Sequence, residues 1–335
     1  MPISIDAAVI ALTVFAVVAA GMRPLIHVLE HLRLLDHPNE RSSHQRPTLV
    51  GGGVLIIATL VPAWFWFQGW SVWPLLVPCV VLTLLSLADD VRGVPTVVRL
   101  ISHIIAVAIV LYHQPELAGW LPAFLPQPVA MICVALGWVW FINLFNFMDG
   151  IDGITGAETL AIAIGVIAVG LAPGDAGKGL PDLAICVAAA AAGFLIWNWH
   201  PAKIFMGDVG SVPLGFLLGW LLLALAASGA WAAALILPAY YIADATITMA
   251  RRGLRGEAVW RAHREHFYQR AVISGLSHAQ VTLRISAANG GLIVLAVLAA
   301  SGHSPWALAG AAALILGLLF ILSKNKTSPF PPPGA

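Results

Sequence analysis

The chain has 335 residues, of which 60 % are hydrophobic and only 10 % are charged. A soluble domain carries roughly 25 % charged residues, so this chain could not cover its own surface with them. The same composition excludes a disordered chain, which needs low hydrophobicity and high charge. The net charge of +1 gives no field suited to nucleic acid, and the three cysteines form neither a disulfide framework nor a zinc motif. The sequence therefore predicts an integral membrane protein.

Apolar runs set the expected fold. A helix needs about 20 apolar residues to cross a bilayer, and we expect an all-α polytopic membrane protein with about 11 (10–11) transmembrane helices. The expected spans are roughly 3–21, 48–67, 72–88, 96–113, 129–147, 154–172, 183–199, 210–228, 230–249, 285–302 and 305–323.

The basic residues predict the orientation of these spans. The expected loops after spans 1, 3, 5, 7 and 9, together with the C-terminus, contain all Lys and Arg residues except Lys178. Because Lys and Arg concentrate in cytoplasmic loops, we expect the N-terminus outside and the C-terminus in the cytoplasm. This predicts one transmembrane domain over residues 1–323, with cytoplasmic loops at about 22–47, 88–99, 147–153, 199–210 and 250–284. Residues 324–335 are expected to form a disordered cytoplasmic tail.

Polar residues form a dense cluster in each of the five expected cytoplasmic loops. The first contains Arg41 and His44 and is followed by the glycine run 51–53, which would let a ligand or backbone approach closely. A basic loop that only fixes orientation is the alternative there. The second has adjacent Asp89 and Asp90, followed by Arg92, and two acids at a membrane boundary call for a divalent cation or a cationic partner. A solvated helix end is the alternative.

The third cluster is the most informative. Asn143, Asn146 and Asp149 are spaced three apart and would lie along one stripe of a helix, and the glycines at 150 and 153 would let Asp152 turn toward the same place. Oxygen-bearing side chains of this kind suit a hard cation such as Mg²⁺. Polar contacts between helices, the usual role of intramembrane Asn, would not explain two aspartates.

The last two clusters add groups that suit anions. Gly207, Asp208 and Ser211 lie just before an apolar run, where helix amides can face an anion or a metal-bound phosphate, although an ordinary N-cap turn is equally consistent. The fifth cluster has two histidines three residues apart among six arginines, which suits phosphate binding; attraction to lipid headgroups is the alternative. Its members are His263, Arg264 and His266, and Asp244 in the preceding span is a further carboxylate that needs a partner.

Taken together, these motifs resemble those of the polyprenyl-phosphate N-acetylhexosamine-1-phosphate transferases (glycosyltransferase family 4), which include phospho-N-acetylmuramoyl-pentapeptide transferase. The resemblance runs from about Asp36 to Arg270. It comprises the Asp-x-Pro-x-x-Arg-x-x-His loop, the Asp-Asp pair, Asn-x-x-Asn-x-x-Asp-Gly-x-Asp-Gly, Gly-Asp-x-Gly-Ser and a His-rich inner loop. That last loop reads His-Arg-Glu-His and not tandem histidines. It resembles the branch that starts O-antigen and related surface glycans.

The resemblance implies an activity and a location. A sugar 1-phosphate would pass from a UDP-amino sugar of GlcNAc, GalNAc, FucNAc or QuiNAc type to undecaprenyl phosphate, with release of UMP. The enzyme would lie in the bacterial inner membrane with its site on the cytoplasmic face, and residues 1–323 would be its catalytic domain. It would use Mg²⁺, with Mn²⁺ as an alternative, and the family suggests a homodimer. Transfer of phospho-MurNAc-pentapeptide is the alternative activity, and an ion-coupled transporter is the remote one.

The resemblance also suggests residue roles. Asp89, Asp90 and Asp152 would be catalytic, and Asn146, Asp208 and Asp149 would hold the metal. Substrates would contact Asn143, Arg41, His44, His263, Arg264, His266, Gly207, Ser211 and Arg92. The expectation that can be tested on coordinates is that residues more than two hundred positions apart converge in one pocket.

Overall fold

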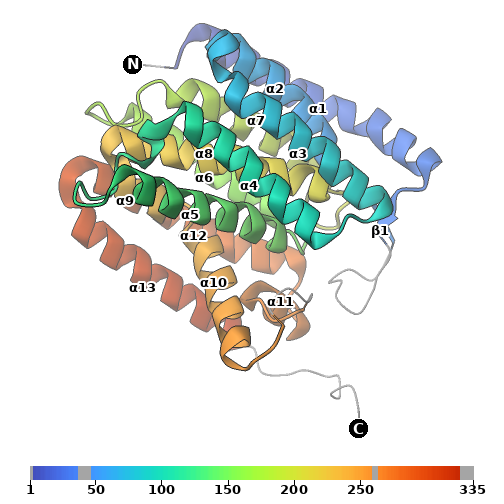
Figure 1. Cartoon of the computed structure of the whole chain (residues 1–335). Helices are drawn as coiled ribbons and strands as arrows, with labels where there is room; N and C mark the ends of the chain where they lie inside the picture. Colours follow the sequence, from blue (N-terminus) through green and yellow to red (C-terminus); the bar gives the residue numbers. More distant parts are fainter. Residues whose placement is uncertain (1–2, 37–46, 259–262, 325–335) are drawn as a thin grey trace.

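The computed structural model describes residues 3–36, 47–258 and 263–324 of the chain. Most of the described chain is helical, and the helices pack into one bundle (Figure 1), so the expected all-α polytopic fold is confirmed. The helices are α1 (Ile5–Leu32), α2 (Gly53–Gln68), α3 (Trp73–Arg92), α4 (Thr96–His113), α5 (Gln127–Phe147), α6 (Ile154–Leu171), α7 (Leu180–Asn198), α8 (Asp208–Leu225), α9 (Trp231–Ile236), α10 (Ala239–Leu254), α11 (Phe267–Ile273), α12 (His278–Leu298) and α13 (Ser304–Ser323).

Eight helical stretches within the described residues are long and apolar enough to cross a membrane. Two of them, 53–92 and 278–323, have 40 and 46 residues, which at 1.5 Å per residue is about twice the thickness of the hydrocarbon core. Each is interrupted near its middle by a glycine with positive φ, Gly69 (58°) and Gly302 (93°). Both long stretches thus contain two expected spans, whereas the total of about 11 and the orientation remain predictions.

The expected ninth span, 230–249, is not one continuous helix, and that expectation was wrong. Helix α9 ends at Ile236 and α10 begins at Ala239, with Pro238 between them. Proline has no amide hydrogen and crowds the preceding turn, so it breaks a helix at such a position. After the break, α10 carries Asp244 and the first arginines of the fifth cluster, including Arg252.

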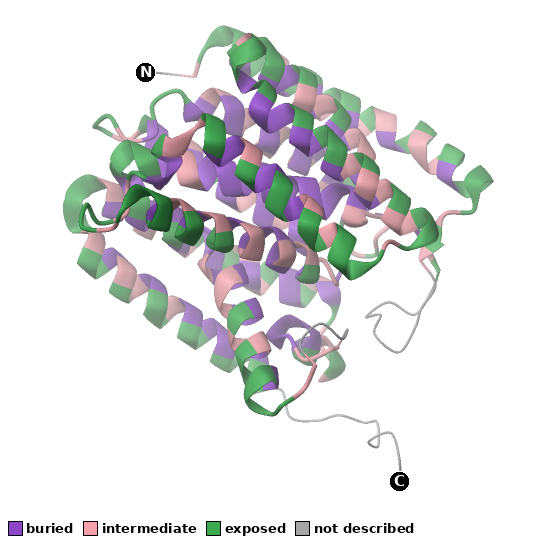
Figure 2. Ribbon diagram, viewed as in Figure 1, coloured by how far each residue is buried: buried purple, intermediate pink, exposed green. Residues whose placement is uncertain are grey.

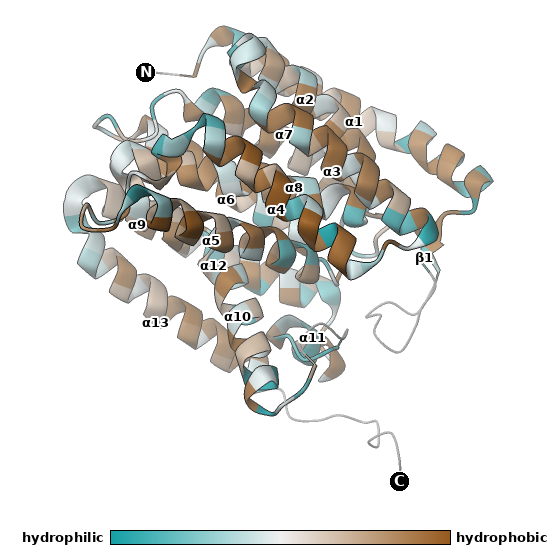
Figure 3. Ribbon diagram, viewed as in Figure 1, coloured by the Kyte–Doolittle hydropathy of each residue, from teal (hydrophilic) through white to brown (hydrophobic). Residues whose placement is uncertain are grey.

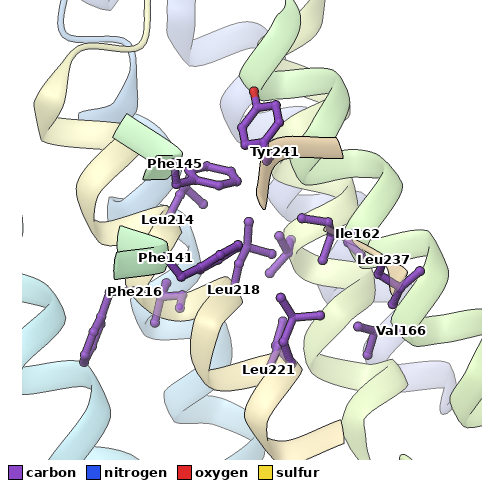
Figure 4. Close-up of a cluster of buried hydrophobic side chains, with 14 of the residues drawn as sticks. Phe141, Phe145, Ile162, Val166, Leu214, Phe216, Leu218, Leu221, Leu237 and Tyr241 are labelled. Atoms are coloured by element: carbon purple, nitrogen blue, oxygen red, sulfur yellow. The ribbon is translucent and has the colours of Figure 1, made fainter. Parts of the chain in front are cut away.

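Helix α8 lies at the centre of the bundle. In the helical stretch 208–236, which begins with α8, 89 % of the most apolar residues are buried, against 28 % in α1 and in α4, which lie at the periphery. Figure 2 shows the buried residues inside the bundle, and Figure 3 shows hydrophobic residues continuing onto the outer helices, as expected for surfaces in contact with lipid. Side chains of α5, α6, α8 and the α9–α10 junction meet in the core (Figure 4), including Phe145, Ile162, Leu218 and Tyr241.

A small sheet, which the sequence did not predict, joins the first and fourth inner loops. Its strands are β1 (Leu35–Asp36), β2 (Thr48–Val50) and β3 (Ile204–Phe205), in the order β1-β2-β3. β1 and β2 are antiparallel, and β2 and β3 are parallel. Next to the sheet, a Cβ atom at Gly53 would lie 2.1 Å from the Cα of Gly210, so the first turns of α2 and α8 can approach this closely only because both residues are glycine.

Candidate active site

Arg99 joins two carboxylates from different sequence clusters. Its Nη1 atom donates to Asp89 Oδ2 at 2.6 Å and to Asp208 Oδ2 at 3.1 Å. Arg99 lies in the first turn of α4, Asp89 in the last turn of α3, and Asp208 begins α8. A positive charge thus lies between the two acids and offsets a repulsion that would be large in a partly dry site.

Asn146 connects this acidic pair to the end of α5. Its Nδ2 atom donates to Asp208 Oδ1 at 2.7 Å and to the Ser211 hydroxyl at 2.9 Å. Since the amide nitrogen faces these two acceptors, its oxygen Oδ1 is left for a cation. Asp89, Asn146 and Asp208 therefore lie within bridging reach of one another, as the motifs predicted.

Asp90 points to a different partner from its neighbour Asp89. Its carboxylate accepts hydrogen bonds from the backbone N–H groups of Asp208 and Val209, both at 3.1 Å, and so caps the N-terminus of α8 from another helix. Gly207, with φ of 77°, precedes this cap, and a Cβ atom there would lie 2.7 Å from Asp90 Oδ2. The contacts of Asp90 and Gly207 thus fix the position of Asp208.

Asp149 lies in the turn after α5, close to the same cluster. Burial raises the pKa of Asp149 to about 7, a hydrogen bond with Thr155 opposes that shift, and the charge of Asp208 adds to it. A carboxyl group with such a pKa is poised to lose its proton when a cation arrives. Asp149 therefore suits the expected metal cluster electrostatically.

Asp152 faces two histidines that the sequence analysis did not single out. Its Oδ2 lies 2.6 Å from His200 Nδ1 and 3.1 Å from the N–H of Ala202, and its Oδ1 lies 3.1 Å from His278 Nδ1. Burial alone would raise the pKa of Asp152, but hydrogen bonds with His278 and His200 outweigh it and lower the pKa to about 2. Neither Asp89 nor Asp208 is among the hydrogen-bond or ion-pair partners of this carboxylate in the described chain.

Two groups of side chains could hold a metal ion. The ligand atoms of Asp152, His200 and His278 all lie within 4.8 Å of one another. Two imidazoles and one carboxylate suit a zinc-like ion, whereas the oxygen donors of Asp89, Asn146 and Asp208 suit magnesium.

The histidine-bearing loop, residues 263–266, packs against α10. His266 is buried, and its Nδ1 atom lies 3.1 Å from Asp244 Oδ1, which gives Asp244 the partner that its place in an apolar segment requires. The ring of His263 lies 4.9 Å from that of His266, with Arg264 between them in sequence. Burial, together with the neighbouring His266 and Arg252, lowers the pKa of His263 to about 4. His263 is therefore neutral at pH 7, so it can donate a hydrogen bond to a phosphate but adds no charge.

Asn143 and Arg92, two of the other expected substrate-binding residues, make no contact with the Asp89–Asp208 pair. Asn143 donates to a carbonyl of its own helix, and its Nδ2 lies 3.4 Å from His103 Nδ1 of α4. Arg92 is exposed and makes no ion pair with the described residues. Arg41 and His44 lie outside the described residues.

Arg99, His200 and His278 are the site residues that the sequence analysis missed. Arg99 was counted only among the basic residues that set orientation, although an arginine in the first turn of an apolar helix is itself a sign of an acidic partner. His200 lies seven residues before the Gly-Asp-x-Gly-Ser motif, and His278 begins α12, outside every motif considered. No local pattern marks His278.

An apolar cavity of about 320 Å³ lies along α5 and α8, walled also by α9 and the start of α10. Its lining includes Trp138, Leu144, Leu222, Trp231 and Leu235. Trp231 and Leu235 are also exposed on the outer surface, so the cavity opens toward the bilayer. Leu144 and Asn146 both lie in the last turn of α5, where side chains two residues apart point to different faces of the helix.

Comparison with known proteins gives concordant matches. The family model for glycosyl transferase family 4 matches residues 72–226. A Streptomyces coelicolor protein named as a glycosyltransferase is 33 % identical over 82 % of this chain and 68 % of its own length. An undecaprenyl-phosphate N-acetylglucosaminyl 1-phosphate transferase by name, from Bacillus subtilis, is 26 % identical over 75 % of this chain and 73 % of its own. A phospho-N-acetylmuramoyl-pentapeptide-transferase from Geobacillus kaustophilus is 31 % identical over 63 % of this chain and 72 % of its own length.

These matches agree with the order of the motifs and with the apolar helical bundle. The first relative exceeds 30 % identity over most of both chains, and the family model covers the segment that carries Asp89, Asn146 and Asp208. The chain therefore belongs to glycosyl transferase family 4, and it is a multi-pass membrane enzyme of the polyprenyl-phosphate sugar-1-phosphate transferase class.

Proposed function

We propose that the enzyme transfers an N-acetylhexosamine 1-phosphate from a UDP-sugar to undecaprenyl phosphate, which gives undecaprenyl-pyrophosphoryl-sugar and UMP. The observation that carries the proposal is the meeting of Asp89, Arg99 and Asp208, from three helices, in a bundle that also holds an apolar cavity along α5 and α8. A site of this kind offers charged groups to phosphates and an apolar surface to a lipid chain at the same boundary. We place the product at the first membrane step of O-antigen or another surface glycan, as the form of the histidine loop suggests.

The cavity along α5 and α8 fits the isoprenoid chain of the acceptor. It is lined almost entirely by apolar side chains and opens toward the bilayer, so a polyprenyl tail could enter it without leaving the hydrocarbon phase. Leu144 of its lining and Asn146 both lie in the last turn of α5, so we infer that the head of a lipid in the cavity lies toward the same end of that helix as the acidic pair.

The site residues fit a divalent cation by their chemistry. Asp89 and Asp208 offer carboxylate oxygens around a point that the Arg99 guanidinium approaches, and Asn146 offers its amide oxygen. These residues, with Asp149, would hold Mg²⁺. Bound magnesium would neutralise the diphosphate of the donor and the charge that develops on the departing UMP.

The chemistry requires one bond to form and one to break. An oxygen of the lipid phosphate attacks the sugar-linked phosphorus of the UDP-sugar, and the bond from that phosphorus to UMP breaks. The attacking oxygen is already anionic near neutral pH, so the protein needs to orient it more than to deprotonate it. Both oxygens of Asp89 accept hydrogen bonds, from Arg99 and from the N–H of Val94, which favours an orienting role for Asp89.

The other residues would bind and hold the donor. Arg264 and the N–H group of His263 suit its phosphates, and His266 lies beside His263. Asp90 would act through the backbone, because it holds the first turn of α8 and thereby Asp208. Asp152 would shape the turn that follows α5 through its two histidine partners.

The location of the site follows from the same chemistry. The nucleotide sugar is cytosolic, and the basic residues lie almost entirely in the loops that carry the site. We infer that the enzyme lies in the bacterial inner membrane with this site on the cytoplasmic face. The family also motivates the inference of a homodimer.

Transfer of phospho-MurNAc-pentapeptide is the second candidate, and the 31 % identity to a relative of that name favours it. The two candidates differ in the donor. Purified enzyme would be incubated with undecaprenyl phosphate, Mg²⁺ and a panel of UDP-N-acetylhexosamines alongside UDP-MurNAc-pentapeptide, and UMP release would be measured. We expect turnover with one of the hexosamine donors. Turnover with the pentapeptide donor alone would support the second candidate, and no UMP from any donor in folded protein would refute both.

A further inference from the structure

We propose that the buried carboxylate of Asp244 is a positioning residue, which fixes the ring of His266 and ties the histidine-bearing loop to the turn that carries Asp149. The part of this inference that concerns substrate binding rests on the proposed function, because that function assigns the donor phosphates to the histidine loop.

Asp244 has an unusual number of hydrogen-bond donors around it for a residue with no exposed surface. Its Oδ1 accepts from the N–H of Phe267 at 3.0 Å and from Thr248 Oγ1 at 3.3 Å, and lies 3.1 Å from His266 Nδ1. Its Oδ2 accepts from the N–H of Tyr268 at 3.2 Å and from the Tyr240 hydroxyl at 2.9 Å. A buried carboxylate with five donors, three of them from residues 266–268, organises the chain segment that supplies them.

The contact with Asp244 determines which nitrogen of His266 carries a proton. An imidazole nitrogen that faces a carboxylate at 3.1 Å carries the hydrogen, so Nδ1 is protonated and Nε2 is the atom left for other partners. The ring is also held from the sides, by His263 at a centroid distance of 4.9 Å and by Tyr268 at 5.7 Å with nearly parallel planes. Carboxylate and ring contacts together leave His266 one orientation.

The same segment reaches the turn after α5 through Tyr268. The Tyr268 hydroxyl donates to the carbonyl oxygen of Phe147 at 3.1 Å. A Cβ atom at Gly150 would lie 2.2 Å from that hydroxyl, so the phenol packs directly on the backbone beside Asp149. Asp244 binds the backbone N–H of Tyr268, and the Tyr268 hydroxyl binds the turn after α5. A change at Asp244 should therefore alter the positions of both His266 and Asp149.

The first test reads the protonation of His266 directly and does not depend on the proposed activity. The full-length protein, labelled with ¹⁵N-histidine and reconstituted in lipid nanodiscs, would be studied by NMR, with His266→Gln to assign the signal. We expect a protonated Nδ1 in the wild-type protein. An unprotonated Nδ1 in the wild-type protein would overturn the proposal, and this measurement needs no destabilised variant.

The second test uses Asp244→Asn, in which the amide keeps the shape but replaces one acceptor oxygen with a donor. We expect a mixture of His266 tautomers and a KM for the UDP-sugar at least tenfold higher, with the KM for the lipid acceptor within twofold of wild type. The matched control is Asp182→Asn. It makes the same change at a carboxylate that binds Ser4, a residue near the N-terminus. Wild-type tautomer and wild-type donor KM in Asp244→Asn would refute the positioning role.

The two tests separate the proposals. If the enzyme turned over no donor, the proposed function would fail, and the NMR measurement would still decide the position of the proton. If turnover occurred but the His266 signal and the KM for the UDP-sugar were unchanged in Asp244→Asn, only the positioning role would fail.

Discussion

Arg99 Nη1 lies 3.1 Å from Asp208 Oδ2, across 109 positions of sequence, and 2.6 Å from Asp89 Oδ2. In the proposed mechanism, this guanidinium offsets the charge of the acidic pair until a cation binds, so that the arginine and the metal compete for the same carboxylates. The contact thus connects the stability of the metal-free site to its affinity for magnesium.

The first prediction concerns Arg99→Gln. Without the guanidinium, the two acids repel one another and attract a divalent cation more strongly, so the Mg²⁺ concentration for half-maximal activity should fall several-fold. The maximal rate should also fall, by about tenfold or more, because a positive partner for the phosphates is lost. Magnesium titrations of UMP release would measure both effects, with Lys178→Gln as a control for loss of an exposed positive charge. A higher magnesium requirement in Arg99→Gln would contradict the assigned competition.

The second prediction concerns Asp149, whose pKa is raised to about 7. Because the folded pKa lies above the ordinary value of 3.8, the favourable contribution of the protonated group is complete below about pH 4 and is lost as the pH rises through about 7. Asp149→Asn should therefore be more stable than wild type by about 1–3 kcal/mol above pH 7, and the advantage should vanish toward pH 4. It should also be nearly inactive.

Thermal unfolding in EDTA between pH 4.5 and pH 8.5 would measure this difference without metal binding. An Asp149→Asn variant that is less stable than wild type at pH 8 would show that the carboxylate is stabilised in the folded protein. The inferred proximity to Asp208 would then need revision.

The third prediction concerns Asp152, whose pKa is lowered to about 2 by His278 and His200 against the effect of burial. A lowered pKa means that the ionised carboxylate stabilises the fold above pH 4 and that this stabilisation is lost as the pH falls from about 4 toward 2. Asp152→Asn should lose about 2 kcal/mol of stability at pH 7 and progressively less below pH 4.

Asp152→Asn also separates a structural role from a catalytic one. After correction for the folded fraction, its activity should fall less than that of Asp208→Asn, since its carboxylate faces histidines and not the acidic pair. Equal loss of activity in both variants, with unchanged stability of Asp152→Asn, would restore the direct catalytic role that the sequence suggested.

The sequence predicted the membrane fold and the meeting of Asp89, Asn146 and Asp208, because long apolar runs and clustered intramembrane acids have few other physical explanations. It did not predict the strands β1 and β3, since two-residue strands leave no periodic pattern. The break at Pro238 was missed because hydropathy averaged over a window conceals a single residue.

Contacts between residues far apart in the sequence were the second feature that the sequence did not predict. Asp90 and Asp89 are equivalent in sequence, yet Asp90 caps α8 across 118 positions while Asp89 binds Arg99. His278 gives no local sign of its contact with Asp152, which spans 126 positions. Such pairings depend on how the helices pack, and no spacing within one segment encodes them.

The fourth prediction tests whether the cavity along α5 and α8 receives the polyprenyl chain. Gly137 lines the cavity, and a Cβ atom there would meet no atom within 4 Å, so a larger side chain can extend into the space without displacing the backbone. Gly137→Phe should raise the KM for undecaprenyl phosphate about tenfold or more by filling the cavity. The KM for the UDP-sugar and the activity with a short-chain prenyl phosphate should stay within twofold, because a short tail needs little of the cavity.

Gly317→Phe, at an exposed glycine of α13 that is equally open, controls for a new phenylalanine on a lipid-facing helix. Two outcomes would place the tail outside this cavity. One is a wild-type KM for undecaprenyl phosphate in both glycine variants, and the other is an equal loss of activity with the short-chain and the long-chain acceptor in Gly137→Phe.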